Sequence, residues 1–153
     1  MNYRSILLLG ISLFLFGLIS CEDDDDENES NISTYNSSES HKAGQDCMNC
    51  HTSGGPGEGW FSIAGTVYDS TLNDVYPNAT VKIYTEPNGA GTLKSTVAVD
   101  RNGNFYTTES IDFGTGIYVL VEGDLETKYM ITPITTGRCN SCHGVTTSKI
   151  WTK

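Results

Sequence analysis

Histidine and cysteine are both scarce in this 153-residue chain. There are three histidines, His41, His51 and His143, and five cysteines. Four of the cysteines fall inside two short motifs, and the fifth, Cys21, ends an apolar N-terminal run. No cysteine is therefore left over for a disulfide framework of the kind that stabilises many small secreted domains.

Basic residues are absent from residues 22–40, which contain eight acidic residues. From His41 onward the chain has eleven acidic and eight basic residues, so most of the net charge of −10 lies in this one stretch. A like-charged segment rich in Ser and Asn cannot form a core, and we expect residues 21–40 to be a disordered tether. The acidity thus belongs to a tether and not to a binding surface, and nothing in the charge pattern indicates a nucleic-acid partner.

A helical apolar stripe is also missing from residues 61–132. Apolar residues there alternate with other residues at a period of two, which indicates β-strands. Turn residues separate the strands, and an Asn-Gly pair in the turn Asp100–Gly103 predicts a hairpin. We expect a mainly β fold, a small antiparallel β-sandwich over 61–132, flanked by loop segments at 41–60 and 133–153. The six expected strands are 61–68, 80–84, 93–99, 104–108, 117–121 and 127–132.

The N-terminus has the plan of a signal peptide over residues 1–20. One basic residue, Arg4, precedes an apolar run from Ile6 to Ile19. The run ends Leu18-Ile19-Ser20-Cys21, which resembles the lipobox of bacterial lipoproteins. The resemblance implies cleavage before Cys21 and acylation of that residue, hence attachment to a membrane through lipid. An ordinary signal peptide and an uncleaved membrane anchor are the alternatives. The acidic run that follows also resembles the surface-export signal of Bacteroidota lipoproteins, although a solvated spacer would look the same.

Two C-x-x-C-H motifs carry the chemistry of the chain. Their spacing is that of c-type haem attachment, in which two thiols add to the vinyl groups of one porphyrin edge and the adjacent His reaches the iron. A zinc site is the alternative, but 88 residues separate Cys50 from Cys139, far more than in zinc ribbons. We therefore expect two covalently bound haem c groups. The expected attachment residues are Cys47, Cys50, Cys139 and Cys142, and the expected proximal ligands are His51 and His143.

Distal ligands are in short supply, because only His41 remains among the histidines. We expect it to ligate one iron, and we favour the haem on Cys139, since reaching the nearer haem requires a tight turn of the chain. An even number of antiparallel strands would place both motifs at one end of the domain. Met130 is the remaining candidate for the other iron, with a core position as its alternative. An exposed surface position is the alternative for His41.

Three segments resemble the carboxypeptidase regulatory-like domain, a transthyretin-like sandwich. They are Gly65-Thr66-Val67-Tyr68-Asp69, Pro77-Asn78-Ala79-Thr80-Val81 and Val99-Asp100-Arg101-Asn102-Gly103-Asn104-Phe105. The resemblance covers about residues 61–122 and implies a fold, with no catalytic residue.

These features together predict a lipid-anchored dihaem cytochrome that transfers electrons at the outer membrane, in the periplasm or on the cell surface. Its expected partners are redox proteins or an extracellular electron acceptor, and the sequence leaves its oligomeric state open. Two alternatives remain. One is a haem enzyme such as a peroxidase, which needs an open iron and a distal acid–base group. The other is a haem-bearing adhesion or assembly module of a larger electron conduit.

Overall fold

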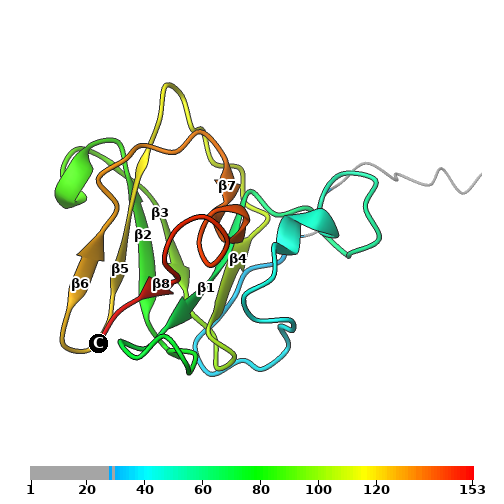
Figure 1. Cartoon of the computed structure of the whole chain (residues 1–153). Coiled ribbons are helices and arrows are strands. Elements are labelled where there is room, and N and C mark those ends of the chain that lie inside the picture. The colour runs from blue at the N-terminus through cyan, green and yellow to red at the C-terminus, as the bar shows by residue number, and fades with distance from the viewer. Residues whose placement is uncertain (1–27, 29) are drawn as a thin grey trace, which may run out of the picture.

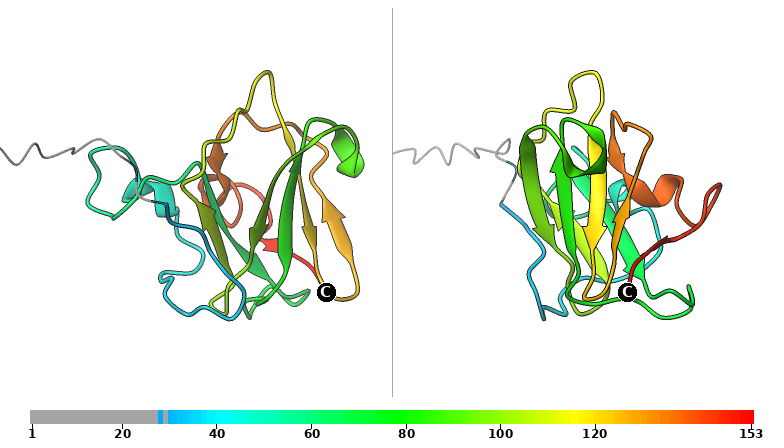
Figure 2. Two further views of the ribbon diagram at one scale, coloured as in Figure 1. Left: turned by 180° about the vertical axis from the view of Figure 1, so that it is seen from behind. Right: turned by 90° about the vertical axis from the view of Figure 1, so that its left-hand side faces the viewer.

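The computed structural model describes residue 28 and residues 30–153, which form two layers of β-strands (Figures 1 and 2). No helix in this part of the chain is both long and apolar enough to cross a membrane. The strands are β1 (Ile63–Tyr68), β2 (Thr80–Tyr84), β3 (Leu93–Ala98), β4 (Asn104–Thr107), β5 (Tyr118–Glu122), β6 (Thr127–Tyr129), β7 (Gly137–Arg138) and β8 (Ile150–Trp151). Three short 3-10 turns complete the list: η1 (Cys47–Asn49), η2 (Pro87–Gly89) and η3 (Cys139–Ser141).

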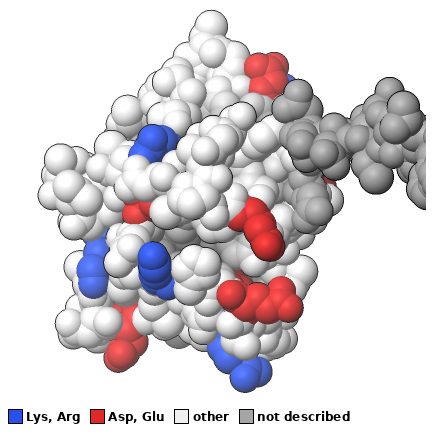
Figure 3. All heavy atoms as spheres, turned by 90° about the vertical axis from the view of Figure 1, so that its right-hand side faces the viewer, with Lys and Arg blue, Asp and Glu red and all other residues white. Residues whose placement is uncertain are grey.

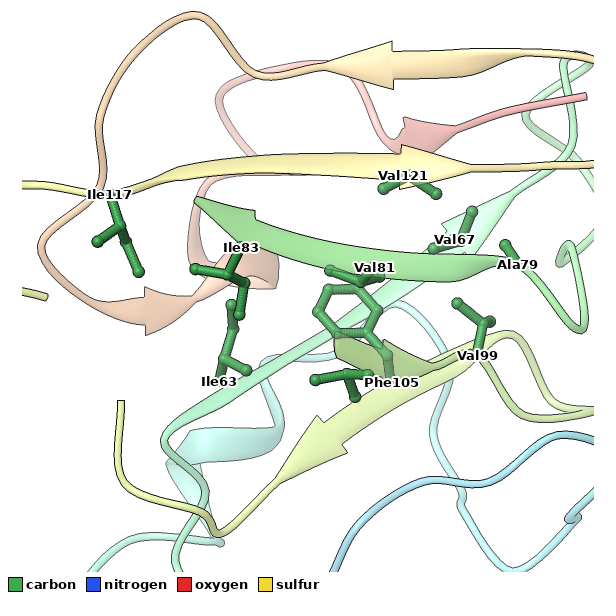
Figure 4. Packing of buried hydrophobic residues seen from close by; sticks show 10 residues of the cluster. Ile63, Val67, Ala79, Val81, Ile83, Val99, Phe105, Ile117 and Val121 are labelled. Atoms are coloured by element: carbon green, nitrogen blue, oxygen red, sulfur yellow. The ribbon is translucent and has the colours of Figure 1, made fainter. Parts of the chain in front are cut away.

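The two sheets pack face to face and confirm the expected small, mainly β sandwich. One sheet has the order β4-β1-β7, with β8 also paired to β1, and the other has the order β3-β2-β5-β6. Buried aliphatic side chains and Phe105 fill the space between them, as Figure 4 shows. Each such side chain contributes roughly 1.5–3 kcal/mol when fully removed from water. The core therefore joins β1 and β4 to the second sheet.

Burial differs between the sheets in a way that bears on the site. In β2, the buried residues Val81 and Ile83 alternate with partly exposed neighbours, which is the pattern of a strand with one covered face. In β1, all six residues are buried. The outer face of β1 is covered by both motifs: the Gly44 amide, before η1, donates to Thr66 Oγ1 at 2.9 Å, and Asn140 Nδ2, in η3, donates to the same oxygen at 3.0 Å. Both motifs are thus packed against a strand whose two faces are covered.

Two details of strand pairing differ from the sequence predictions. Asp100–Gly103 makes a tight turn, but β3 pairs with β2 while β4 pairs with β1, so the turn crosses between sheets and closes no hairpin. Val97 of β3 and Phe105 of β4 are both buried in the core, so they pack toward one another from opposite sheets. In addition, β7 and β8 run parallel to β1 within a segment expected to be loop.

The described part of the expected tether is also ordered, which corrects the boundary at residue 40. Ile32 forms an antiparallel bridge with Thr107, and the Ser33 amide donates to the Tyr106 carbonyl at 3.0 Å. The Ser33 hydroxyl donates to the Ala98 carbonyl at 2.7 Å, and Ser33 is buried. This stretch covers the free edge of β4, where its polar residues satisfy backbone groups. The signal peptide, Cys21 and the acidic residues 22–27 lie outside the described residues.

Candidate functional site

The two motifs adopt the same local conformation. Each forms one 3-10 turn, and the His amide donates to the carbonyl of the first Cys at 3.0 Å in both, from His51 to Cys47 and from His143 to Cys139. The four cysteines are free thiols, and the second thiol-bearing residue of each motif is exposed. In each motif, both cysteines and the histidine line the same cavity.

Both motif histidines are oriented by a backbone carbonyl. His51 Nδ1 lies 2.8 Å from the Glu58 oxygen, and His143 Nδ1 lies 2.7 Å from the Ser148 oxygen. A carbonyl only accepts, so Nδ1 carries the proton in each ring and Nε2 keeps its lone pair. A hydrogen bond of this kind fixes the tautomer and ring direction of metal-bound histidines.

The first motif opens onto a cavity of about 610 Å³ that is lined by Cys47, Cys50, His51 and His41. This volume lies in the usual range for ligand pockets. The ring centres of His41 and His51 are 6.0 Å apart, with an angle of 38° between the ring planes. Two imidazoles bound to opposite sides of one metal, each through a bond of about 2 Å, have ring centres on the order of 6 Å apart. The spacing therefore fits a pair of axial ligands.

His41 thus lines the cavity of the first motif and not that of the second, whereas the sequence favoured a position near the second. A tight turn makes this possible: Lys42 and Gly44 adopt positive φ of 53° and 82°, and the Gln45 amide donates to the Lys42 carbonyl at 3.1 Å. Because glycine has no Cβ, Gly44 adopts this positive φ without steric strain. The turn returns the chain over the first motif.

Aromatic residues form one side of the first cavity. Phe61 stacks on the His51 ring with centroids 4.2 Å apart, and Tyr106 stacks on Phe61 at 4.8 Å. Phe61 and Tyr106 belong to a small buried cluster against which Cys47 and Met48 pack. The His51 imidazole is therefore held by packing as well as by its hydrogen bond.

The second motif opens onto a separate cavity of about 530 Å³, lined by Cys139, Cys142 and His143. Met130 lines the same cavity, immediately after β6, and its amide donates to the Val119 carbonyl at 2.8 Å. It is only partly buried and is not a member of the central core cluster. The structure thus places the predicted second distal candidate, Met130, in the cavity of the second motif.

Side chains flanking the motifs join the two sites. Arg138 precedes Cys139 and donates from Nε to Asp46 Oδ2 at 3.0 Å, while Asp46 precedes Cys47. Asn140, inside the second motif, is buried and donates from Nδ2 to the Gln45 carbonyl at 2.9 Å. Its Oδ1 accepts the Thr66 amide of β1 at 3.2 Å, between the short pairings made by β7 and β8. Motifs far apart in sequence are therefore adjacent along β1.

The first cysteine of each motif lies in a more enclosed setting than the second. Burial raises the pKa of the Cys139 thiol to about 12, and burial also raises the pKa of Cys47. Gly65 permits the enclosure, because a Cβ at that position would lie 2.9 Å from Cys139 Cβ. Both thiols donate weakly to the carbonyl two residues earlier, at 3.6 Å for Cys47 and 3.5 Å for Cys139.

Sequence reasoning did not identify the residues that support the motifs. Phe61, Asp46, Arg138 and Asn140 carry no pattern that marks them as part of a site. One signal was present in the sequence: the residues directly before the two motifs, Asp46 and Arg138, have opposite charge. Trp151 lines the second cavity from β8, a strand that the sequence did not predict.

The zinc alternative gains no support from the arrangement. Within the described residues, no three His, Cys, Asp or Glu side chains converge as a group that could hold a metal ion.

No protein-family model, no curated protein and no solved structure matches the chain. The resemblance to the carboxypeptidase regulatory-like domain therefore stays an interpretation of residues 61–122, and the site has to be interpreted from its own geometry.

Proposed function

We propose that this protein is a lipid-anchored dihaem c-type cytochrome that transfers electrons. One observation carries the proposal: each C-x-x-C-H motif presents two free thiols and an imidazole with a free Nε2, and each opens onto its own cavity. The donor set and the cavity volumes fit a covalently bound haem in each site.

The residues of the chain have separate tasks in this proposal. The cysteines would tether the porphyrins, and the carbonyls of Glu58 and Ser148 hold the imidazoles of His51 and His143 in the ligating direction. Bound haem would supply an iron that gains and loses one electron. The surrounding side chains would set the potential of each iron through axial ligation, charge and exposure.

The two sites would differ in their distal ligand. His41 is the candidate for the first iron because of its 6.0 Å ring spacing from His51. Met130 is the candidate for the second because it lines that cavity with His143. A His/Met pair raises the potential of a haem above that of a His/His pair. The sites are therefore expected to have unequal potentials.

Two alternatives are distinguished by spectroscopy and by mass. A peroxidase would keep one iron open to substrate, so it would show a high-spin haem in the resting protein. A haem-bearing assembly module would form larger complexes, and native mass spectrometry would detect them.

Figure 3 shows one face of the molecule, with acidic and basic side chains in small separate groups and no continuous basic patch. The electron carrier remains our proposal, with redox proteins or an extracellular acceptor as partners.

Location follows from Cys21, which we propose to be lipidated at the outer membrane, on the periplasmic or cell-surface side. Replacing the residue tests this: Cys21→Ala protein should leave the membrane fraction or remain unprocessed. Mature-sized Cys21→Ala protein that still sediments with membranes would contradict the anchor.

The function is tested by haem stoichiometry. We expect two haems per chain by pyridine haemochrome assay and by mass, after expression with a cytochrome c maturation system. Replacing Cys47 and Cys50 by Ala should remove one haem, and replacing Cys139 and Cys142 should remove the other. Each double variant is the control for its counterpart, because the intact motif reports on folding. A haem count that is zero, or unchanged in a double variant, would refute the corresponding site.

A further inference from the structure

The two candidate sites are separated by an oriented charge pair, Asp46–Arg138. Asp46 lines the first cavity and not the second, whereas Arg138 lines the second and not the first. Their side chains bond to one another directly, through Arg138 Nε at 3.0 Å and also through Nη2. The pair therefore stands between the cavities with its negative end toward the first motif.

The geometry fixes this orientation. Asp46 Oδ1 accepts the Met48 amide at 3.2 Å and so caps η1, while Oδ2 receives Arg138. The pairing of β7 with β1 holds the Arg138 backbone on the side of the second motif. Its guanidinium also donates from Nη2 to Asn49 Oδ1, so it contacts two residues that line the first cavity. The Asp46 side chain is 12% exposed, and the Arg138 side chain is 41% exposed. Solvent screens such a partly buried pair less than it screens an exposed one.

We propose that the Asp46–Arg138 pair widens the separation between the two haem potentials, lowering the first and raising the second in the same direction as the distal ligands; this rests on the proposed function above. A nearby negative charge stabilises the oxidised iron and lowers its potential, and a positive charge does the reverse. Asp46 would therefore favour the oxidised state of a haem held in the first site, and Arg138 would favour the reduced state of a haem held in the second.

Other charges at the cavities have the same signs. The first cavity is lined by Glu39, Asp46 and Glu58 with a single base, Lys42. The second is lined by Lys128, Arg138 and Lys149 and by no acidic residue. Lys128 is also paired with Glu126, which offsets part of its charge. The Asp46–Arg138 pair is distinctive because each end lines a different cavity.

The test is a spectroelectrochemical titration of the haem-loaded protein and two double variants. Asp46→Asn with Arg138→Gln removes both charges and keeps hydrogen-bonding groups. Asp46→Arg with Arg138→Asp keeps an ion pair but reverses its direction. The single-haem cysteine variants assign each midpoint potential to its haem. The control pair is Lys82→Gln with Glu122→Gln, which removes a 2.7 Å ion pair whose residues line neither cavity.

The neutral variant should raise the first potential and lower the second. The equilibrium constant for sharing one electron between the two haems should change on the order of tenfold, which corresponds to a change of about 59 mV in the separation of the two potentials. The reversed pair should change it further in the same direction, and the control should leave it unchanged. If the pair has only a structural role, the reversed pair should restore the wild-type potentials, and that result would overturn the proposal.

Two further outcomes bear on the proposal. An unchanged or a wider separation of the potentials in the neutral variant would overturn it. If the reversed pair does not fold, the neutral variant decides alone, with haem content and melting temperature as folding checks. Loss of the proposed function is a separate result, because it would appear as missing haem in the wild type before any potential is measured.

Discussion

Replacing Gly57 by Ala gives a direct test of how the first motif is held. A Cβ at this position would lie 2.8 Å from His51 Nδ1 and 2.9 Å from both Cγ and Cε1. Such contacts are shorter than ordinary van der Waals contact, so the ring has to move by at least about half an ångström. It has little freedom to do so, because Glu58 holds Nδ1 at 2.8 Å and Phe61 stacks on the ring at 4.2 Å. Overpacking of this kind costs about 1–3 kcal/mol.

We expect Gly57→Ala to displace the His51 imidazole while the thioether bonds remain. Electron paramagnetic resonance of the haem-loaded protein should show loss of part or all of the low-spin signal of one haem. The second haem serves as an internal reference and should be unchanged. Ser53→Ala, at an exposed position in the same loop, is the matched control. Wild-type spectra and melting temperature in Gly57→Ala would refute the placement of His51 between Gly57 and Phe61.

Three further predictions follow from the site. His41→Ala should turn the first haem high-spin, because its distal ligand is lost; an unchanged optical spectrum would make His41 a surface residue. Met130→Leu should abolish a near-infrared methionine band and lower the potential of the second haem, while a change at the first haem instead would contradict the cavity assignment. In haem-free protein at pH 8, iodoacetamide should label exposed Cys50 and Cys142 first and Cys139 last, because the raised pKa of Cys139, about 12, leaves little thiolate. Labelling of Cys139 should accelerate as the pH rises toward that value, and early labelling at pH 8 would show that its thiol is not enclosed.

The sequence alone established the local features of this protein. The C-x-x-C-H spacing identifies candidate thiols and imidazoles because it depends on five consecutive residues. The period of two over 61–68 and 80–84 predicted β1 and β2, since alternation is a local consequence of strand geometry. The sequence also predicted the tight turn at Asp100–Gly103, but the turn residues alone do not determine whether the adjoining strands pair with one another.

Pairing across the fold was decided only by the tertiary structure. The second motif lies against the first because β7 and β8 pair with β1, and two-residue strands leave almost no pattern in a sequence. The assignment of His41 to the first site depends on a turn through Lys42 and Gly44, whose reach the sequence left open.

The ordered conformation of residues 30–40 likewise depends on a partner strand that the sequence alone did not identify. Their Ser and Asn groups are as compatible with solvent as with backbone, and the free edge of β4 determines which they bind. The sequence thus determined which groups are available for chemistry. The burial of both faces of β1 determined which of those groups meet, because covering that strand requires chain from both ends of the domain.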